Sequence, residues 1–172
     1  LLLRLPRVLL AIIAGAGLAL AGALMQSVTR NYLVSPFTLG ISSAAAFGAS
    51  LCIVLAAGTA LDSDLGIITS AFLLSCACGL IVYGIAQRSG LSPTTIVLVG
   101  IALNYFFSAL TATLEFFAQE HKLAAVIQWT FGSLHRASWE YVTIGGVIVT
   151  LGLAAALFYA LPLNVMAVSD DE

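Results

Sequence analysis

The chain has 172 residues, of which 61% are hydrophobic and only 8% charged, and its formal net charge is −2. A soluble domain carries about 25% charged residues, so this composition excludes an ordinary soluble protein and indicates an integral membrane protein. Without a basic patch, the sequence also offers nothing to bind nucleic acid. Long uninterrupted apolar segments favour membrane helices over a β-barrel, whose strands would alternate over about ten residues.

The first spanning helix is expected at about residues 6–26. Ala11, Gly15, Ala19 and Gly22 follow one another along it at helical spacing. Small residues on one face let a neighbouring membrane helix approach closely, so we expect this stripe to be a packing face.

A second span is expected at about residues 38–57. Gly40, Ala44 and Gly48 repeat there at intervals of four and predict another small-residue packing face. A third span is expected at about residues 66–86, followed by a short polar turn.

The fourth span, at about residues 93–118, is the most informative segment. Pro93 suits the first turn of a helix, where its missing N–H costs nothing. At about 1.5 Å of rise per residue, the segment is long enough to cross a hydrocarbon core of about 30 Å with some tilt.

One face of this fourth helix is polar, because its small and hydrogen-bonding residues recur at steps of three and four. Polar groups inside a membrane are costly and normally face a bundle interior or a water-filled path. Small and hydroxyl residues also hold helices together, so a path lining and a packing contact both remain open here. The residues concerned are Gly100, Asn104, Ser108, Thr111 and Glu115.

The stretch from 119 to 140 is the longest polar one, yet it retains helical spacing at about residues 121–133. This segment is too short to span and predicts a helix at the membrane surface. Trp129, Trp139 and Tyr141 lie where interfacial aromatic residues are expected.

The last span is expected at about residues 141–161. The sequence therefore predicts an all-α, polytopic membrane helix bundle with five transmembrane helices and one short surface helix.

No catalytic residue or metal site is predicted. The chain lacks a G-x-x-x-x-G-K-[ST] loop for ATP phosphates, and it has neither an H-E-x-x-H nor a G-x-S-x-G motif. His121 and His135 share the long loop with Glu120 and Glu140. Transition-metal or haem ligation is conceivable there, but loop histidines without a further motif are usually solvated.

Several stretches resemble the FecCD-type permease family, the membrane subunits of ABC importers for ferric siderophores, haem and cobalamin. They are RLPRVLLAIIAGAGLALAGALMQ, RNYLVSPFTLGISSAAAFGA, LVGIALN, QWTFGSL, ASWEYV and PLNVMAVSDDE, in the order of the family. One departure is Tyr32, where the family usually has Pro after Asn.

The resemblance implies a fragment of a ten-helix permease, covering about its second to sixth helices. Such permeases work in the cell membrane as dimers, homodimeric or paired with a paralogue. They act with cytoplasmic ATPase subunits, which bind the ATP, and with a periplasmic or extracellular substrate-binding protein. No cofactor is expected in this chain. A ferric siderophore is the first expectation for the cargo, and haem and cobalamin are the others.

The resemblance also implies roles for particular residues. The substrate path is lined by the helix matching residues 92–118. Cytoplasmic constrictions fall at positions matching Asn31, Leu33, Pro93 and Thr94. The segment 163–172 begins the coupling contact with the ATPase, with Leu163, Asn164, Asp170, Asp171 and Glu172 as its residues.

The positive charges and the family resemblance imply opposite orientations of the chain in the membrane. The count of positive charges places the N-terminal side in the cytoplasm by a margin of two residues. The resemblance implies the reverse, with that side and the 119–140 loop periplasmic, and its motifs outweigh so small a margin.

Two other classes of function are considered. An ion-coupled secondary transporter needs an ionisable relay in the spans, for which Glu115 is the one candidate. A non-transporting membrane scaffold needs none.

Overall fold

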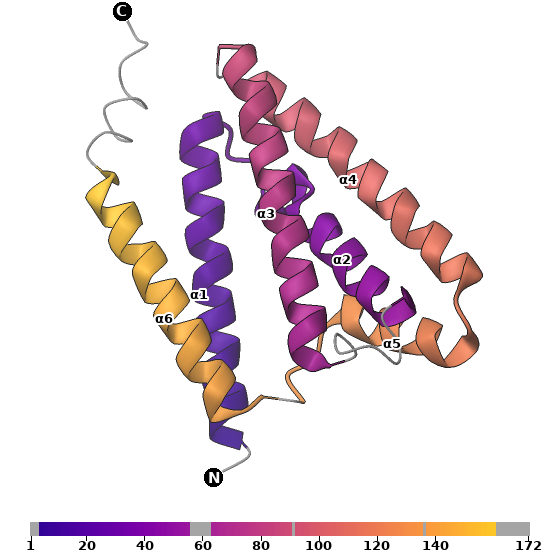
Figure 1. Cartoon of the computed structure of the whole chain (residues 1–172). Coiled ribbons are helices and arrows are strands. Elements are labelled where there is room, and N and C mark those ends of the chain that lie inside the picture. Colours follow the sequence, from indigo (N-terminus) through magenta and orange to yellow (C-terminus); the bar gives the residue numbers. More distant parts are fainter. Residues whose placement is uncertain (1–3, 56–62, 91, 136, 161–172) are drawn as a thin grey trace, which may run out of the picture. The chain divides into compact units, whose positions relative to one another are not determined.

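The computed structural model of the chain describes residues 4–55, 63–90, 92–135 and 137–160. Every element in these ranges is helical, which confirms the all-α prediction (Figure 1). The elements are α1 (Arg4–Thr29), the 3₁₀ helix η1 (Pro36–Leu39), α2 (Ile41–Leu55), α3 (Asp64–Arg88), α4 (Pro93–Phe117), α5 (Glu120–Phe131) and α6 (Trp139–Phe158).

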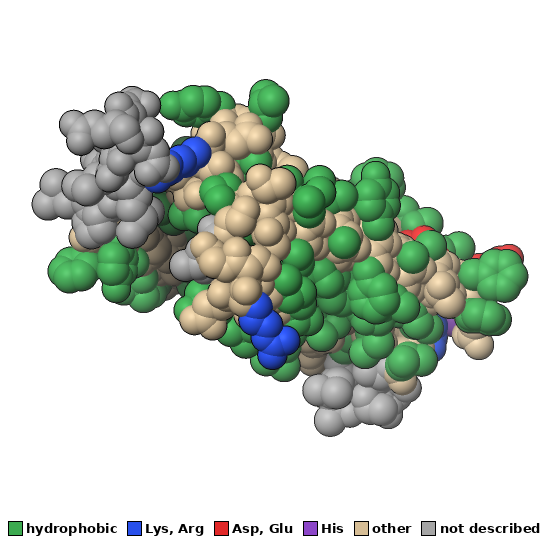
Figure 2. Space-filling model, turned by 90° about the horizontal axis from the view of Figure 1, so that it is seen from above, with side chains coloured by type: hydrophobic (Ala, Val, Ile, Leu, Met, Phe, Trp, Pro, Cys, Tyr) green, Lys and Arg blue, Asp and Glu red, His purple; other side chains and the backbone are tan. Residues whose placement is uncertain are grey.

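Among the described residues, four helices, α1, α3, α4 and α6, are long and apolar enough to cross a membrane. The helix α2 is apolar but has 15 residues, about 22 Å at 1.5 Å per residue. It begins three residues after the start of the expected span because Gly40, with a φ of 73°, separates it from η1, and residues 56 and 57 of that span lie outside the described residues. Hydrophobic side chains dominate the surface in Figure 2, and charged ones are few. Such a surface is typical of helices that face lipid or other membrane helices.

The chain forms two compact units. The first holds α1 and α6 with the turn that follows α1, up to Ser35. The second, Pro36–Gly132, holds η1 and α2 to α5.

In the first unit, α1 and α6 run parallel (Figure 1). Their contact advances in step along both helices: Ile13 meets Gly145 and Gly146, and Val149 lies 3.1 Å from an ideal Cβ on Gly17. The expected stripe through Gly15 is not this contact face, since no atom lies within 4 Å of a Cβ placed on Gly15. Small residues occur on more than one face of α1, and α6 packs where Gly17 makes room for Val149.

In the second unit, α2 and α3 form a tightly packed pair. A Cβ on Gly48 would lie 2.6 Å from the Ser70 carbonyl oxygen, so only glycine allows this approach. Ala44 is fully buried beside Cys78 and Phe107. The expected small-residue face at 40, 44 and 48 is therefore confirmed as a packing face.

Side-chain hydrogen bonds add to this packing. The Ser70 hydroxyl donates to the Gly48 carbonyl at 2.7 Å, and the Cys78 thiol donates to the Leu39 carbonyl at 3.7 Å. In a membrane, where apolar contact with lipid competes with apolar contact between helices, such bonds and close backbone approach hold helices together.

The short helix α5 lies in the range expected for a surface helix, and it packs on α2 across the end of the bundle (Figure 1). Val126 is only 1% exposed, and the Lys122 ammonium donates to the Val54 carbonyl at 2.7 Å. A cation at the last carbonyls of a helix is favoured by the helix dipole.

Candidate functional site

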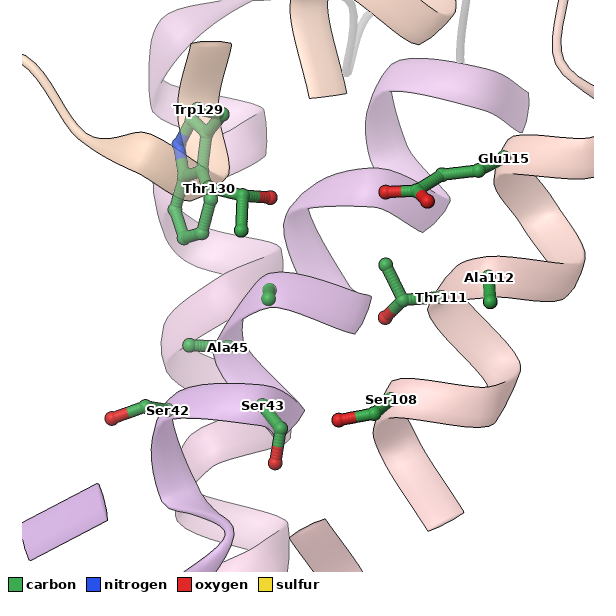
Figure 3. A pocket seen from close by; sticks show the side chains of 10 residues that line it. Ser42, Ser43, Ala45, Ser108, Thr111, Ala112, Glu115, Trp129 and Thr130 are labelled. Carbon is green, nitrogen blue, oxygen red and sulfur yellow. The ribbon is translucent and has the colours of Figure 1, made fainter. Parts of the chain in front are cut away.

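A pocket of about 530 Å³ lies in the second unit, among α2, α4 and α5 (Figure 3). The Glu115 carboxylate extends from α4 toward α2, and the Ser108 hydroxyl points toward the side of Ser43. The lining residues are Ser42, Ser43, Ala45, Ala46, Ser108, Thr111, Ala112, Glu115, Trp129 and Thr130. Most of them are small or carry a hydroxyl group.

The polar face expected on α4 divides into two parts. Gly100 is buried, and a Cβ there would lie 2.6 Å from the Thr38 carbonyl oxygen and 2.7 Å from the Leu39 Cα. This end of the face is a packing contact with η1. Ser108, Thr111 and Glu115 line the pocket instead.

Asn104 lies between these two parts. Its side chain is half-buried and accepts a hydrogen bond of 3.5 Å from the Ser108 hydroxyl. A Cβ on Gly40 would lie 2.8 Å from the Asn104 backbone nitrogen, so the backbones of the two segments are in close contact here.

Several hydroxyl groups of the pocket donate their hydrogen bond to a backbone carbonyl three or four residues earlier in the chain. Thr111 donates to the Phe107 carbonyl, Thr130 to the Val126 carbonyl and Ser43 to the Gly40 carbonyl, each at 2.9 Å. A hydroxyl whose hydrogen is engaged still offers oxygen lone pairs. The pocket is thus lined with hydrogen-bond acceptors and carries one carboxylate.

Sequence reasoning about α4 missed the walls that α2 and α5 contribute. Ser42 and Ser43 lie in the first turn of α2, while Trp129 and Thr130 belong to the segment for which the sequence predicts a surface helix. The adjacent serines at a helix start were a usable signal, since polar side chains are unusual in a membrane span.

The residues expected at the constriction fall in both units. Asn31 and Leu33 lie on an exposed turn after α1, in the first unit. Pro93 and Thr94 form the first turn of α4, in the second unit, where Pro93 occupies the favoured N-terminal position and Ser92 is the N-cap.

The expected coupling residues, Leu163, Asn164, Asp170, Asp171 and Glu172, lie outside the described residues. His121 and His135 are both exposed. Within the ranges that the structure describes, no three His, Cys, Asp or Glu side chains come together as a metal site would require.

Four apolar helices of spanning length and a polar pocket among membrane helices define a multi-pass membrane protein. The sequence matches the FecCD transport family along residues 1–172. The chain therefore belongs to this family, which confirms the resemblance seen in its motifs.

Relatives of known name are similar along nearly all of this chain. The Fe(3+)-citrate import system permease protein YfmD of Bacillus subtilis is 33% identical, with 98% of this chain matching 49% of YfmD. The hemin transport system permease protein HmuU of Yersinia pestis is 32% identical, with 99% of this chain matching 51% of HmuU. The chain spans about half the length of these curated relatives.

A solved structure is similar as well. It is described as an inward-facing conformation of a metal-chelate type ABC transporter, and it superposes with a TM-score of 0.85 at 32% identity. The match covers 98% of this chain and 53% of that one.

Proposed function

We propose that this chain is part of the membrane-spanning permease of an ABC importer that moves a metal chelate through the cell membrane into the cytoplasm. The pocket on the polar face of α4 is the observation that carries the proposal. A carboxylate inside a membrane protein is costly to keep unless it faces water or a passing polar solute, and the hydroxyl groups around Glu115 still offer oxygen lone pairs to such a solute. Family membership and the names of the relatives support the same conclusion.

The lining suits weak contact with a bulky, polar cargo. Ala45, Ala46 and Ala112 offer little surface to grip, and Glu115 is the one charged residue of the lining. A tightly held cargo would not leave, because release must stay favourable at the far side. A ferric siderophore is the first candidate, and haem and cobalamin are the others. The names of relatives refer to Fe(3+)-citrate import, hemin transport and cobalamin import.

The proposed mechanism is alternating access. ATP binding and hydrolysis take place in separate ATPase subunits, which act on the permease through the segment 163–172. A second permease copy completes the path, and a substrate-binding protein delivers the cargo. The ATPase subunits and the substrate-binding protein both bias a permease with two conformations, outward-open and inward-open. Neither of these two partners needs a catalytic residue in this chain.

The test is uptake into liposomes that hold the full-length permease with its ATPase and its substrate-binding protein. Labelled ferric siderophore, haem and cobalamin are offered in parallel, each with ATP and with a non-hydrolysable analogue. We expect ATP-dependent accumulation of one of the three.

Two other outcomes separate the alternatives. If the binding protein stimulates ATP hydrolysis but none of the three accumulates, the importer class stands and the cargo differs. If neither flux nor stimulation is seen, the transport proposal is wrong and a scaffold remains. Uptake driven by an ion gradient without ATP points to a secondary transporter instead.

A further inference from the structure

The pocket among α2, α4 and α5 offers more hydrogen-bond acceptors than donors. All but one of its lining hydroxyl groups donate to another acceptor of the chain; they belong to Ser43, Ser108, Thr111 and Thr130. The remaining hydroxyl, on Ser42, points away from α4 in Figure 3. Because an engaged hydroxyl can still accept a hydrogen bond, the side of the pocket at α4 presents oxygen acceptors to a ligand.

The carboxylate of Glu115 gives this acceptor surface a negative charge. Glu115 is half-buried and lines the pocket, and in Figure 3 its carboxylate and the Thr130 hydroxyl point toward one another. Among the described residues, no cation or N–H donor bonds to this carboxylate. Lys122, the only Lys or Arg of α5, donates to the Val54 carbonyl instead. A ligand that brings a positive charge would offset the cost of keeping the carboxylate inside the membrane protein.

The aromatic residue of the lining favours a positive charge as well. Trp129 of α5 lines the pocket together with Glu115 of α4. The face of an indole ring attracts cations more strongly than that of other aromatic side chains. An ammonium group has three N–H donors and a positive charge, so it can bond to carboxylate and hydroxyl oxygens and also contact the indole.

The lining does not suit a bare metal ion. Among the described residues that line it, Glu115 has no second carboxylate, His or Cys beside it. Sites for Ca²⁺ or transition metals in proteins combine several such ligands. A metal would therefore have to arrive already chelated, and the pocket would contact the chelator.

We propose that the pocket recognises a protonated amine on the cargo, with Glu115 as the specificity-determining residue. This inference rests on the proposed function, which places the pocket on the path. The cargo class is then a metal chelate that carries a free amino group. An anionic chelate would meet a like charge at Glu115, and the acceptor oxygens around it would give that chelate no hydrogen bonds.

The first experiment measures the sign of the electrostatic potential in the pocket of the full-length permease. Thr130→Cys, with Cys76 and any other accessible cysteine replaced by Ser, is modified by a cationic and by an anionic methanethiosulfonate reagent of similar size. The ratio of the two rates cancels any effect of a variant on the reactivity of the thiol itself. Glu115→Gln should lower the cationic-to-anionic ratio about fivefold or more, the factor that one unit charge about 4 Å away contributes even in water.

Glu120 provides a matched control. It is exposed in the first turn of α5 and does not line the pocket. It lies ten positions before Thr130, about 15 Å along the helix, which exceeds the Debye length of about 8–10 Å near physiological salt. Glu120→Gln should leave the ratio unchanged. Glu115→Asp keeps the charge and should retain most of the preference for the cationic reagent.

The second experiment identifies the group that is recognised. The ferric complex of desferrioxamine B ends in a protonated primary amine, and N-acetylation removes that charge while it leaves the iron-binding groups intact. Each chelate is titrated for its protection of the thiol at position 130 against an uncharged maleimide, without ATPase or binding protein. With Glu115 present, the amine form should protect at an about fivefold lower concentration than the acetylated form. In the Glu115→Gln variant the two chelates should protect equally.

The outcomes are distinguishable. An unchanged ratio of rates in Glu115→Gln overturns the inference. Equal protection by the two chelates with Glu115 present, or none by either, overturns the amine as the recognised group. A preference for the amine form that Glu115→Gln abolishes supports the inference. The same preference in a permease without ATP-dependent uptake of any chelate supports the amine site but overturns the proposed function.

Discussion

Gly100 and Ser108 lie on the same face of α4, but Gly100 packs against η1 and Ser108 lines the pocket. Gly100 gives η1 room to pack, because any Cβ would meet the Thr38 carbonyl. Ser108 is exposed and lines the pocket. The polar face is thus a packing contact at one end and a candidate path lining at the other. The structure shows the packing interpretation at the Gly100 end, while the path lining at the Ser108 end stays a prediction.

Ser108→Trp should block uptake of cargo. An indole at this position would fill much of the space between α4 and the side of Ser43. Thr113→Trp is the matched control, because Thr113 is exposed on α4 but does not line the pocket. Initial rates in liposomes should fall to background for the first variant and stay near wild type for the second.

Ser108→Ala should leave the apparent affinity for cargo nearly unchanged, because the proposed path works without tight binding. Normal uptake by the Ser108→Trp variant would show that the pocket is not on the path.

Gly100→Ala should destabilise the protein by about 1–3 kcal/mol, the usual cost of forcing a side chain into a packed contact. The new methyl group would lie against backbone atoms of Thr38 and Leu39, which cannot rotate away. Gly84→Ala is the control, since a Cβ on Gly84 meets no atom within 4 Å. Thermal unfolding in detergent should show a lower Tm for the first variant alone, and equal Tm values would contradict the packing role.

At the scale of elements, α5 is a wall of the pocket that is attached mainly to α2. Trp129 and Thr130 of α5 line the pocket. Two other residues of α5 attach it: Val126 is buried, and the Lys122 ammonium donates a hydrogen bond to the Val54 carbonyl of α2. The position of α5 on α2 therefore sets the width of the pocket.

Lys122→Met should loosen α5, because it removes the ammonium that caps the end of α2. Hydrogen bonds to charged groups contribute about 1.5–3 kcal/mol, so amide exchange in α5 should accelerate about tenfold or more. Lys122→Arg keeps a donor and a positive charge and should retain most of the protection. Hydrogen–deuterium exchange with mass spectrometry measures both, and identical exchange in Met and wild-type proteins would refute the attachment.

The starts of the helices were largely predictable from local signals. Pro93 occupies the first turn of α4, as expected. The start of α2 was not predictable, because Gly40 fits the small-residue pattern of a continuous helix. Gly40 has a φ of 73°, which ends the helical path, and it also lies against α4, where a Cβ would be 2.8 Å from the Asn104 backbone nitrogen. Both features require glycine, and neither can be read from the small-residue pattern.

At the scale of the whole molecule, the first and last described helices are neighbours. The contact between α1 and α6 joins residues more than a hundred positions apart in the sequence, with Gly17 opposite Val149. Parallel packing through glycine allows the two backbones to come close without polar contacts.

A disulfide should form readily between Gly17→Cys and Val149→Cys, in a background with Cys76 replaced by Ser. An ideal Cβ on Gly17 lies 3.1 Å from Val149 Cγ2, an atom bonded to the Val149 Cβ. The two positions are therefore close to the Cβ–Cβ separation of about 3.5–4.5 Å that a disulfide spans. Gly15→Cys with Val149→Cys is the control and should stay reduced under the same mild oxidation. Mass spectrometry of the cross-linked peptides checks both, and the opposite result would mean that α1 is rotated.

The sequence by itself determined the class of protein, the all-α architecture, the family and the polar face of α4. Composition and residue spacing act within each helix and can therefore be read from the sequence without knowing which helices are neighbours. Only the tertiary structure decided that α6 packs at Gly17 rather than at the stripe through Gly15, and that Ser43, Trp129 and Thr130 join α4 in one pocket. The reason is that an apolar helix face gains little by exchanging lipid for another helix, so hydrophobicity alone does not choose which face is packed. A sequence pattern marks a face that can be covered, and long-range packing selects what covers it.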